Sequence, residues 1–149
     1  MTELDEINAH YDAMPPVRAM QVRAVRYDGR SLDLRAPLAH NLNDKGCAFG
    51  GSLVSLMTLA GWGLMTLKLR EAGFRADVYV ADSQVRYLAP LYADLAASAT
   101  LATDVDWSSV LQAWQARGRT RAGVAASVSA PDGTVVAEMQ GRYAALRPA

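Results

Sequence analysis

The sequence has one cysteine, no excess of either charge and no extended run of purely apolar residues. A single cysteine cannot form a disulfide within the chain, so no disulfide framework holds the fold. Fifteen basic side chains balance fifteen acidic ones, and this gives no sign of nucleic acid or an anionic membrane surface as partner. The first six residues lack the basic region and the apolar run of a signal peptide. We therefore expect a cytoplasmic protein.

The most apolar stretch, residues 53–69, is interrupted by polar residues and glycines, namely Ser55, Thr58, Gly61, Gly63, Thr66 and Lys68. It is too polar and too short for a membrane span, and a buried helix explains it better. With 149 residues, 51% of them hydrophobic, the chain can bury one sizeable core. No repeat, low-complexity segment or linker divides it. We predict a single domain over residues 1–149.

Periodicity and turn signals predict a short N-terminal helix, six strands and one long helix. The N-terminal helix covers 2–13, with Thr2 as its cap, and the Pro-Pro pair that follows ends it. Strands are expected at 17–27, 31–36, 77–87, 95–103, 119–130 and 135–146. The long helix ends near Gly73, and a short helix runs from its cap at Asp106 to Gly118.

Two strands, a helix and then a meander of alternating strands predict an α+β fold, an antiparallel sheet packed on a single helix. In the strand at 77–87, alternation places one set of residues on one face, namely Tyr79, Ala81, Ser83, Val85 and Tyr87. The other face is expected to carry Asp82, Gln84 and Arg86. An open sheet of this kind leaves edges that a homodimer would cover.

The loop and helix at 43–62 form the strongest candidate site. Gly46, Gly50 and Gly51 allow tight turns and leave backbone N–H groups uncovered. The start of a helix adds unpaired donors and the positive end of the helix dipole. Such a place binds phosphate or a developing oxyanion. The glycine spacing matches neither the Rossmann fingerprint nor the phosphate-binding P-loop.

Specific motifs point to a family. One run resembles the Asn-x-x-Gly-x-x-His-Gly-Gly pattern of the hotdog-fold acyl-CoA thioesterases of the phenylacetate-pathway type: Asn43-x-x-Gly46-x-x-Phe49-Gly50-Gly51. Residues 85–90, Val-Arg-Tyr-Leu-Ala-Pro, resemble the strand of these enzymes that ends in Tyr-x-x-Pro. The longer string at 45–53, with Gly-Trp-Gly at 61–63, is more similar to the thioesterase family named after the C-terminal domain of YiiD. The resemblance covers roughly residues 16–146.

The resemblance implies a hotdog fold, in which an antiparallel sheet of about six strands wraps one long central helix. It also implies a homodimer or a dimer of dimers with active sites at the subunit boundary. In the related thioesterases a backbone N–H polarises the thioester carbonyl, and this role carries over to Gly50. The asparagine that orients water or the carbonyl corresponds to Asn43. A donor aimed at charge that appears only in the transition state contributes on the order of 3 kcal/mol.

Two positions depart from the family pattern. Phe49 stands where the family has histidine, and Thr58 corresponds to the helix carboxylate that serves as general base or nucleophile. A threonine hydroxyl does not titrate near neutral pH, so it can orient water but is a poor base. Helical spacing places Gly51, Ser55, Thr58 and Trp62 on one stripe that leads away from the loop. We expect this stripe to line an acyl or aromatic pocket.

We therefore predict an acyl thioester hydrolase that uses water as nucleophile and acts on acyl-CoA or acyl-carrier thioesters. Coenzyme A is then part of the substrate, and no cofactor or metal is expected. The predicted catalytic residues are Asn43, Gly50 and Thr58. The predicted substrate-binding residues are Gly46, Phe49, Gly51, Ser55, Trp62 and Ser83.

Structural roles remain open for several of these residues. A threonine inside a helix often bonds a carbonyl one turn back, paired glycines can form only a tight turn, and an asparagine can cap a loop. His40 and Asp44 are further candidates for the base, and Cys47 for a nucleophile. Coenzyme A phosphates have three candidate partners, Arg86, Arg119 and Arg121.

The alternative function is a non-catalytic acyl-CoA or acyl-carrier binding module that keeps the pocket without a base. A hydratase or dehydratase on the same fold ranks third, because the His/Asp or His/Glu pairing of those enzymes is not recognisable.

Overall fold

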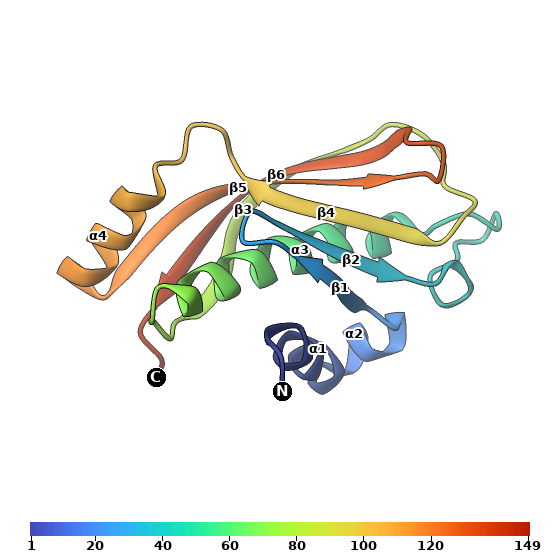
Figure 1. The fold of residues 1–149 in the computed structure, drawn as a ribbon. Coiled ribbons are helices and arrows are strands. Elements are labelled where there is room, and N and C mark those ends of the chain that lie inside the picture. Colours follow the sequence, from blue (N-terminus) through green and yellow to red (C-terminus); the bar gives the residue numbers. More distant parts are fainter.

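The computed structural model describes all 149 residues as one six-stranded antiparallel sheet wrapped around a central helix (Figure 1). The strand order is β1-β2-β4-β5-β6-β3. The strands are β1 Arg23–Tyr27, β2 Ser31–Ala36, β3 Asp77–Tyr87, β4 Leu95–Leu101, β5 Arg119–Ser129 and β6 Val135–Leu146. The central helix α3, Gly50–Glu71, lies against one face of the sheet and contacts five of the six strands. The predicted α+β class and hotdog arrangement are confirmed.

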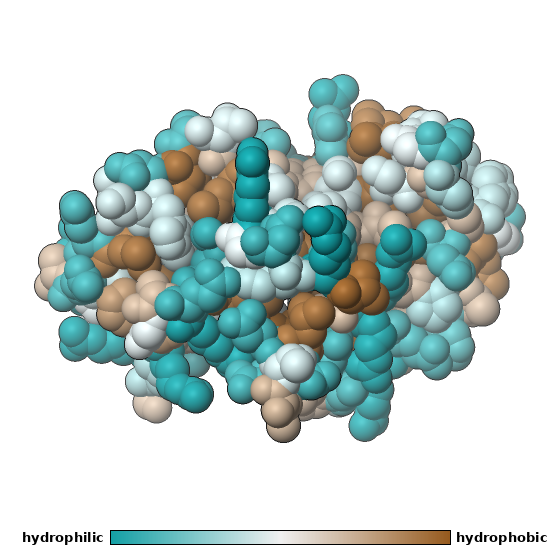
Figure 2. Space-filling model, in the orientation of Figure 1, coloured by the Kyte–Doolittle hydropathy of each residue, from teal (hydrophilic) through white to brown (hydrophobic).

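Helix α3 is buried on almost every side, as its apolar sequence requires. Thirteen of its 22 residues are buried in the free chain. By length and composition α3 could cross a membrane, but 72% of its most apolar window is buried inside the fold. It is therefore the core helix of the sheet. The face of the molecule in Figure 2 shows mainly hydrophilic and neutral residues, with small separate hydrophobic patches between them.

Two glycines let tyrosine side chains pack directly on the backbone of α3. The hydroxyl of Tyr143 on β6 donates to the Thr58 carbonyl at 2.7 Å, and a Cβ at Gly61 would overlap that hydroxyl. The hydroxyl of Tyr11 donates to the Leu59 carbonyl at 3.0 Å, and a Cβ at Gly63 would lie 2.7 Å from it. Burial raises the pKa of both phenols. These contacts fix α3 between the sheet and the N-terminal helix.

The N-terminal helix α1, Glu3–Ala13, begins at Thr2 as predicted, where Thr2 and Asp5 form a reciprocal capping box. A second helix follows, α2 Pro15–Met20. The predicted strand at 17–27 is therefore too long, because β1 begins only at Arg23. Proline fixes a helical φ and lacks the N–H that the first helical turn leaves unused, so the Pro-Pro pair starts a helix as well as ending one.

The remaining elements differ from the predictions only at their ends. Strand β4 ends two residues early, at Leu101, and a short 3₁₀ helix, η1 Leu38–His40, forms in the loop before α3. Helix α4, Trp107–Arg117, has the predicted Asp106 cap and ends at Gly118 in the left-handed conformation. It extends beyond one end of the sheet (Figure 1) and is tied to β5 by the Thr120 hydroxyl, which donates to the Val110 carbonyl at 2.8 Å.

The predicted faces of β3 are partly wrong, because an irregularity in its pairing with β6 interrupts the alternation between Val80 and Asp82. Beyond that point Ser83, Val85 and Tyr87 face α3, as their partners on β6 do. Before it, Val80 pairs with the inward-facing Tyr143, whereas Tyr79 pairs with Ala144 on the outer face. Tyr79 therefore shares the outer face with Asp82, contrary to the prediction. Simple period-two counting cannot detect an inserted residue.

Candidate functional site

The loop before α3 is organised by the side chain of Asn43. Its Oδ1 accepts hydrogen bonds from the backbone N–H of Lys45 at 2.8 Å and of Cys47 at 3.1 Å. Its Nδ2 donates to the Cys47 Sγ at 3.1 Å, and its backbone N–H donates to the Cys47 carbonyl at 2.8 Å. Gly46 has a φ of 82°, which lets the chain turn back inside this loop. Asn43 thus holds the shape of the loop through contacts within it.

The end of the loop is anchored in the core. The Ala48 N–H donates to the Leu91 carbonyl and the Phe49 N–H to the Asn41 carbonyl, both at 2.8 Å. Asn41 is buried, and its Nδ2 donates to the carbonyls of Met20 and Pro37. Asn41 could not be identified from the sequence, since nothing in its local pattern separates a buried amide from the polar loop residues around it. These bonds fix the position at which α3 begins.

Two backbone donors at the start of α3 have no protein acceptor. Phe49 is the N-cap residue, and its carbonyl accepts from the N–H groups of Ser52 and Leu53. The N–H groups of Gly50 and Gly51 make no hydrogen bond to the protein, and Gly50 is partly exposed. They lie at the positive end of a 22-residue helix. The arrangement suits an oxyanion or another negatively charged oxygen.

Two aromatic rings flank these donors. The Phe49 side chain is 53% exposed and folds back over Gly51, where an added Cβ would overlap its ring. The Tyr87 ring of β3 lies against Gly50, with its hydroxyl 3.4 Å from the Gly50 carbonyl. Phe49 offers no hydrogen-bonding group where the family pattern has histidine. Two partly exposed aromatic rings therefore border the donors.

The predicted stripe on α3 is its partly exposed side. Gly51, Ser55, Thr58 and Trp62 are each partly exposed, whereas most of the helix between them is buried. The Thr58 hydroxyl lies 3.8 Å from the Met139 sulfur as donor and does not bond a carbonyl of its own helix. The Trp62 ring makes an edge contact with His10. Along this side α3 faces the exposed inner residues of β3.

Ser83 on β3 lies level with Thr58 on the facing side of α3. It pairs with Gly141 on β6, between the Tyr143 and Met139 side chains that contact Thr58. Gly50 is eight residues from Thr58 along α3, a rise of about 12 Å. A single chain therefore does not bring the Gly50 donor and the Thr58 hydroxyl to one thioester carbonyl.

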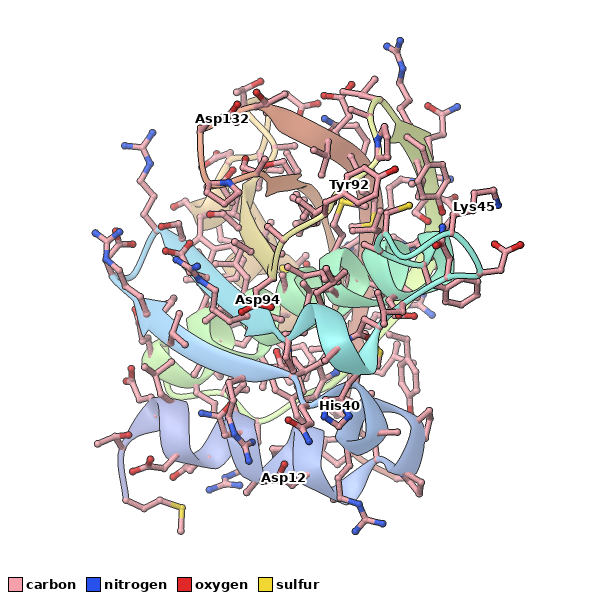
Figure 3. All side chains as sticks on the ribbon, turned by 90° about the vertical axis from the view of Figure 1, so that its right-hand side faces the viewer. Asp12, His40, Lys45, Tyr92, Asp94 and Asp132 are labelled. Atoms are coloured by element: carbon pink, nitrogen blue, oxygen red, sulfur yellow. The ribbon has the colours of Figure 1, made fainter.

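The other sequence candidates make no hydrogen bond with the donors. His40 is exposed on η1, and Figure 3 shows it on a different part of this surface from the Lys45 loop. Asp44 is exposed and pairs with Lys45 at 2.9 Å. Cys47 is buried, with its sulfur turned to Asn43.

The outer face of the sheet carries the remaining charged candidates. Asp82 accepts two hydrogen bonds from Arg142, and this contact lowers the pKa of the Asp82 carboxyl. Arg119 and Arg121 line an open groove between β5 and α4. No group of three or more histidine, cysteine or acidic side chains is placed to hold a metal ion.

Residues 3–147 match a family model described as "Putative thioesterase (yiiD_Cterm)". A protein of unknown function from Chlorobaculum tepidum is 27% identical, with a TM-score of 0.89 over 97% of this chain and 94% of that one. A crystal structure described as a putative thioesterase from Shewanella oneidensis is 26% identical, with a TM-score of 0.86 over 97% of both chains. The Escherichia coli PaaI protein from the phenylacetic acid degradation operon is 15% identical, with a TM-score of 0.72 over 99% of this chain and 94% of that one, and shows the shared fold alone.

Proposed function

Because the chain belongs to the thioesterase family named after the C-terminal domain of YiiD, we propose that it hydrolyses acyl-CoA or acyl-carrier thioesters. The observation that carries this proposal is the pair of N–H groups at Gly50 and Gly51, which have no protein acceptor. They stand at the positive end of the central helix and beside two aromatic rings, and a hydrogen bond from them to developing negative charge strengthens as a bound acyl group excludes water from the site.

The proposed reaction is a direct attack of water on the thioester. Water adds to the carbonyl carbon, and the Gly50 N–H, assisted by that of Gly51, binds the oxygen on which negative charge develops. Collapse of this tetrahedral species breaks the C–S bond, and the thiolate leaves. The two protons of the attacking water end on the thiol and the solvent, and the products are a carboxylate and a free thiol.

We propose that the complete site forms between two copies of the chain. β3 is an edge strand of 11 residues, and its inward-facing Val80 and Tyr87 are 42% and 56% exposed. A long exposed strand edge of this kind is a template for pairing. A two-fold axis at Val85, midway between Ser83 and Tyr87, places the Tyr87 end of one copy level with Ser83 of the other. The Gly50 loop of one copy, which lies against Tyr87, then comes level with Thr58 of α3 in its partner.

Within this arrangement Thr58 positions the attacking water, and Phe49 and Trp62 form the apolar wall around the acyl group. Ser55 on α3 and Ser83 on β3 line the space between these two elements, next to Thr58. Asn43 acts through the loop, because its hydrogen bonds hold the backbone that presents Gly50. We propose a homodimer or a dimer of dimers as the active form, and the cytoplasm as its location.

The test is free-thiol release from a panel of short, medium, long-chain and aromatic acyl-CoA thioesters, with the carboxylic acid product identified by mass spectrometry. Thiol and acid formed in equal amounts, with repeated turnover, would establish the hydrolase and its acyl range. Binding of the same thioesters is measured in parallel by isothermal titration calorimetry.

The second candidate is a non-catalytic acyl-binding module. It is favoured by one observation: the position corresponding to the family carboxylate is Thr58, and the side chains beside the Gly50 and Gly51 donors are those of Tyr87 and Phe49, neither a carboxylate nor an imidazole. Saturable binding of a thioester without release of thiol would select this function. The Gly50 loop would then act as a clamp on the thioester carbonyl.

A further inference from the structure

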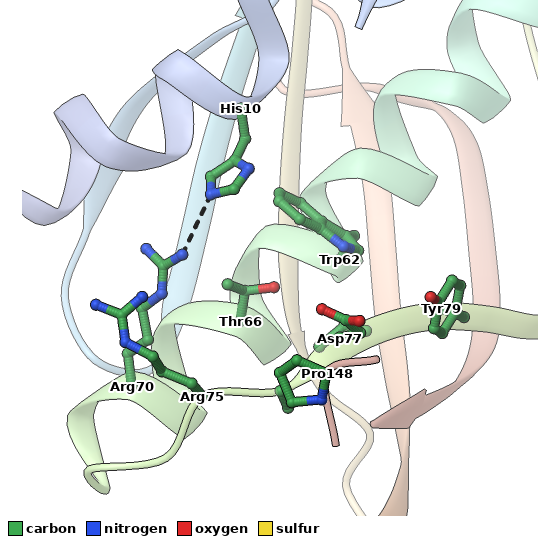
Figure 4. Close-up of a pocket in the computed structure, with 10 residues that line it drawn as sticks. His10, Trp62, Thr66, Arg70, Arg75, Asp77, Tyr79 and Pro148 are labelled. Carbon is green, nitrogen blue, oxygen red and sulfur yellow. Dashed lines mark hydrogen bonds between the residues drawn. The ribbon is translucent and has the colours of Figure 1, made fainter. Parts of the chain in front are cut away.

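A cavity of about 440 Å³ lies between α1, the second half of α3 and the start of β3. We call it the α1 cavity. Figure 4 shows side chains from these elements and from the loop between α3 and β3 around it, including His10, Trp62, Thr66, Arg70, Arg75 and Asp77. Its volume falls within the range of sites for small organic molecules.

One wall of the α1 cavity carries a buried hydroxyl without a partner. Thr66 is 6% exposed, and its Oγ1 makes no hydrogen bond to the protein. In Figure 4 this oxygen is turned toward the side of the cavity where Asp77 lies. Buried polar groups normally have a hydrogen-bond partner, and an unpaired one costs free energy. A ligand with a polar atom near Thr66 would supply the missing bond.

Two guanidinium groups lie at the same cavity. Arg70 is held in place, because its Nη1 donates to Glu6 at 2.8 Å and its Nη2 lies 3.2 Å from the His10 Nε2. Glu6 offsets the charge of Arg70. Arg75 is exposed and takes part in no ion pair, and neither does Asp77 on the opposite side. Arg75 therefore provides a cation that an incoming anion can pair with.

The chemistry of this lining matches an anion with an apolar body. Guanidinium groups bind carboxylates through paired N–H donors in a fixed plane. The Trp62 ring of α3, Val78 of β3 and Pro148 supply the apolar part of the lining. A molecule that is charged at one end and hydrocarbon along its length satisfies both kinds of surface.

We infer that the α1 cavity binds an organic carboxylate, with its oxygens on Arg75 and Arg70 and its hydrocarbon chain against Trp62. A second step rests on the proposed function and on the paired arrangement of β3. In that arrangement the Gly50 donors of one copy lie at Thr58 of the other, and Trp62 and Thr66 continue the same helix from there toward the α1 cavity. The carboxylate is then the far end of an acyl group, so the preferred substrates are thioesters of dicarboxylic acids.

The binding step is tested by calorimetry with hexanoate and with hexanamide, its uncharged isostere, on the unmodified chain. Hexanoate should bind at least tenfold more tightly than hexanamide. Arg75→Gln should weaken hexanoate about ten- to a hundredfold, the size expected for a hydrogen bond to a charged group, without changing hexanamide. Asp77→Asn is the matched control and should strengthen hexanoate binding. Loss of binding equally for both probes, or no effect of either substitution, would overturn the site.

The substrate step is tested by comparing kcat/KM for adipoyl-CoA and hexanoyl-CoA, which differ in the terminal carboxylate. A preference for adipoyl-CoA that disappears in Arg75→Gln supports the assignment. Equal hydrolysis of the two thioesters would overturn the dicarboxylic preference while leaving the thioesterase in place. Absence of hydrolysis with these two thioesters and with the whole panel used to test the proposed function, together with hexanoate binding that depends on Arg75, would remove the proposed function and keep the carboxylate site.

Discussion

The role of the Gly50 N–H can be tested by a substitution that removes this one donor and little else. Gly50 is the first residue of α3, the position at which proline is best tolerated, because its missing N–H is not used by the helix. Phe49, the preceding residue, has φ −65° and ψ 130°, which is a conformation that a following proline permits. Gly50→Pro should therefore fold with a nearly unchanged melting temperature.

The expected effect of Gly50→Pro on catalysis is large. Removal of one oxyanion donor costs about 3 to 4 kcal/mol in the transition state, which lowers kcat by roughly 10² to 10³. KM should change much less, because the donor acts mainly on charge that is absent from the bound thioester. Gly50→Ala is the matched control: it keeps the N–H, and its Cβ would lie 3.5 Å from the Tyr87 ring, an ordinary contact.

Both variants are compared by steady-state thiol release, which reports turnover, and by a thermal melt, which reports folding. Turnover should collapse in Gly50→Pro and stay within a few-fold of the unmodified chain in Gly50→Ala. Equal turnover in the two folded variants would refute the idea that this N–H stabilises the transition state.

Three further outcomes follow from particular contacts. Asn43→Ala removes the acceptor of two loop N–H groups and should lower kcat in the same thiol assay. Asn43→Asp keeps the acceptor oxygens and should retain much of the original kcat. Equal activity of the two variants would contradict the positioning role of Asn43. Gly61→Ala forces a methyl group into the Tyr143 hydroxyl and should lower the free energy of unfolding by about 1 to 3 kcal/mol in urea titration, with partial recovery in the double variant Gly61→Ala, Tyr143→Phe. Tyr11 and Tyr143 have raised pKa values in the folded state. The stability that each phenol contributes is therefore complete below the unfolded pKa near 10 and is lost as the pH rises above it, at about 1.4 kcal/mol per pH unit. Melting temperatures between pH 9 and 11 should fall less steeply in Tyr143→Phe than in the unmodified chain.

Much of the fold was predictable from local sequence signals. The cap at Thr2, the turn glycines and the alternating strands placed nearly every element, because these signals act within a few residues. The strand predicted at 17–27 was six residues too long at its start, because the Pro-Pro pair both ends one helix and starts another. The outer position of Tyr79 was missed because one inserted residue shifts a whole face of β3.

The candidate site was only partly predictable. The glycine motif located the donors at the start of α3, and helical spacing identified the partly exposed stripe that includes Thr58 and Trp62. The contacts of Asn43 with its own loop and the separation of Gly50 from Thr58 follow from three-dimensional geometry that no local pattern contains. The α1 cavity is lined by side chains from separate elements of the chain, so neither residue spacing nor periodicity in the sequence could have predicted it.

The central claim is that the Gly50 donor of one chain and the Thr58 hydroxyl of another act on the same thioester. Thr58→Val is isosteric and should lower turnover about three- to tenfold, the size expected for one neutral hydrogen bond. Differently tagged Gly50→Pro and Thr58→Val chains are combined, and mixed oligomers are purified through both tags. One intact site per mixed pair predicts thiol release near half that of the unmodified protein, well above either parent variant. Turnover equal to the mean of the two parents would contradict a site shared between chains.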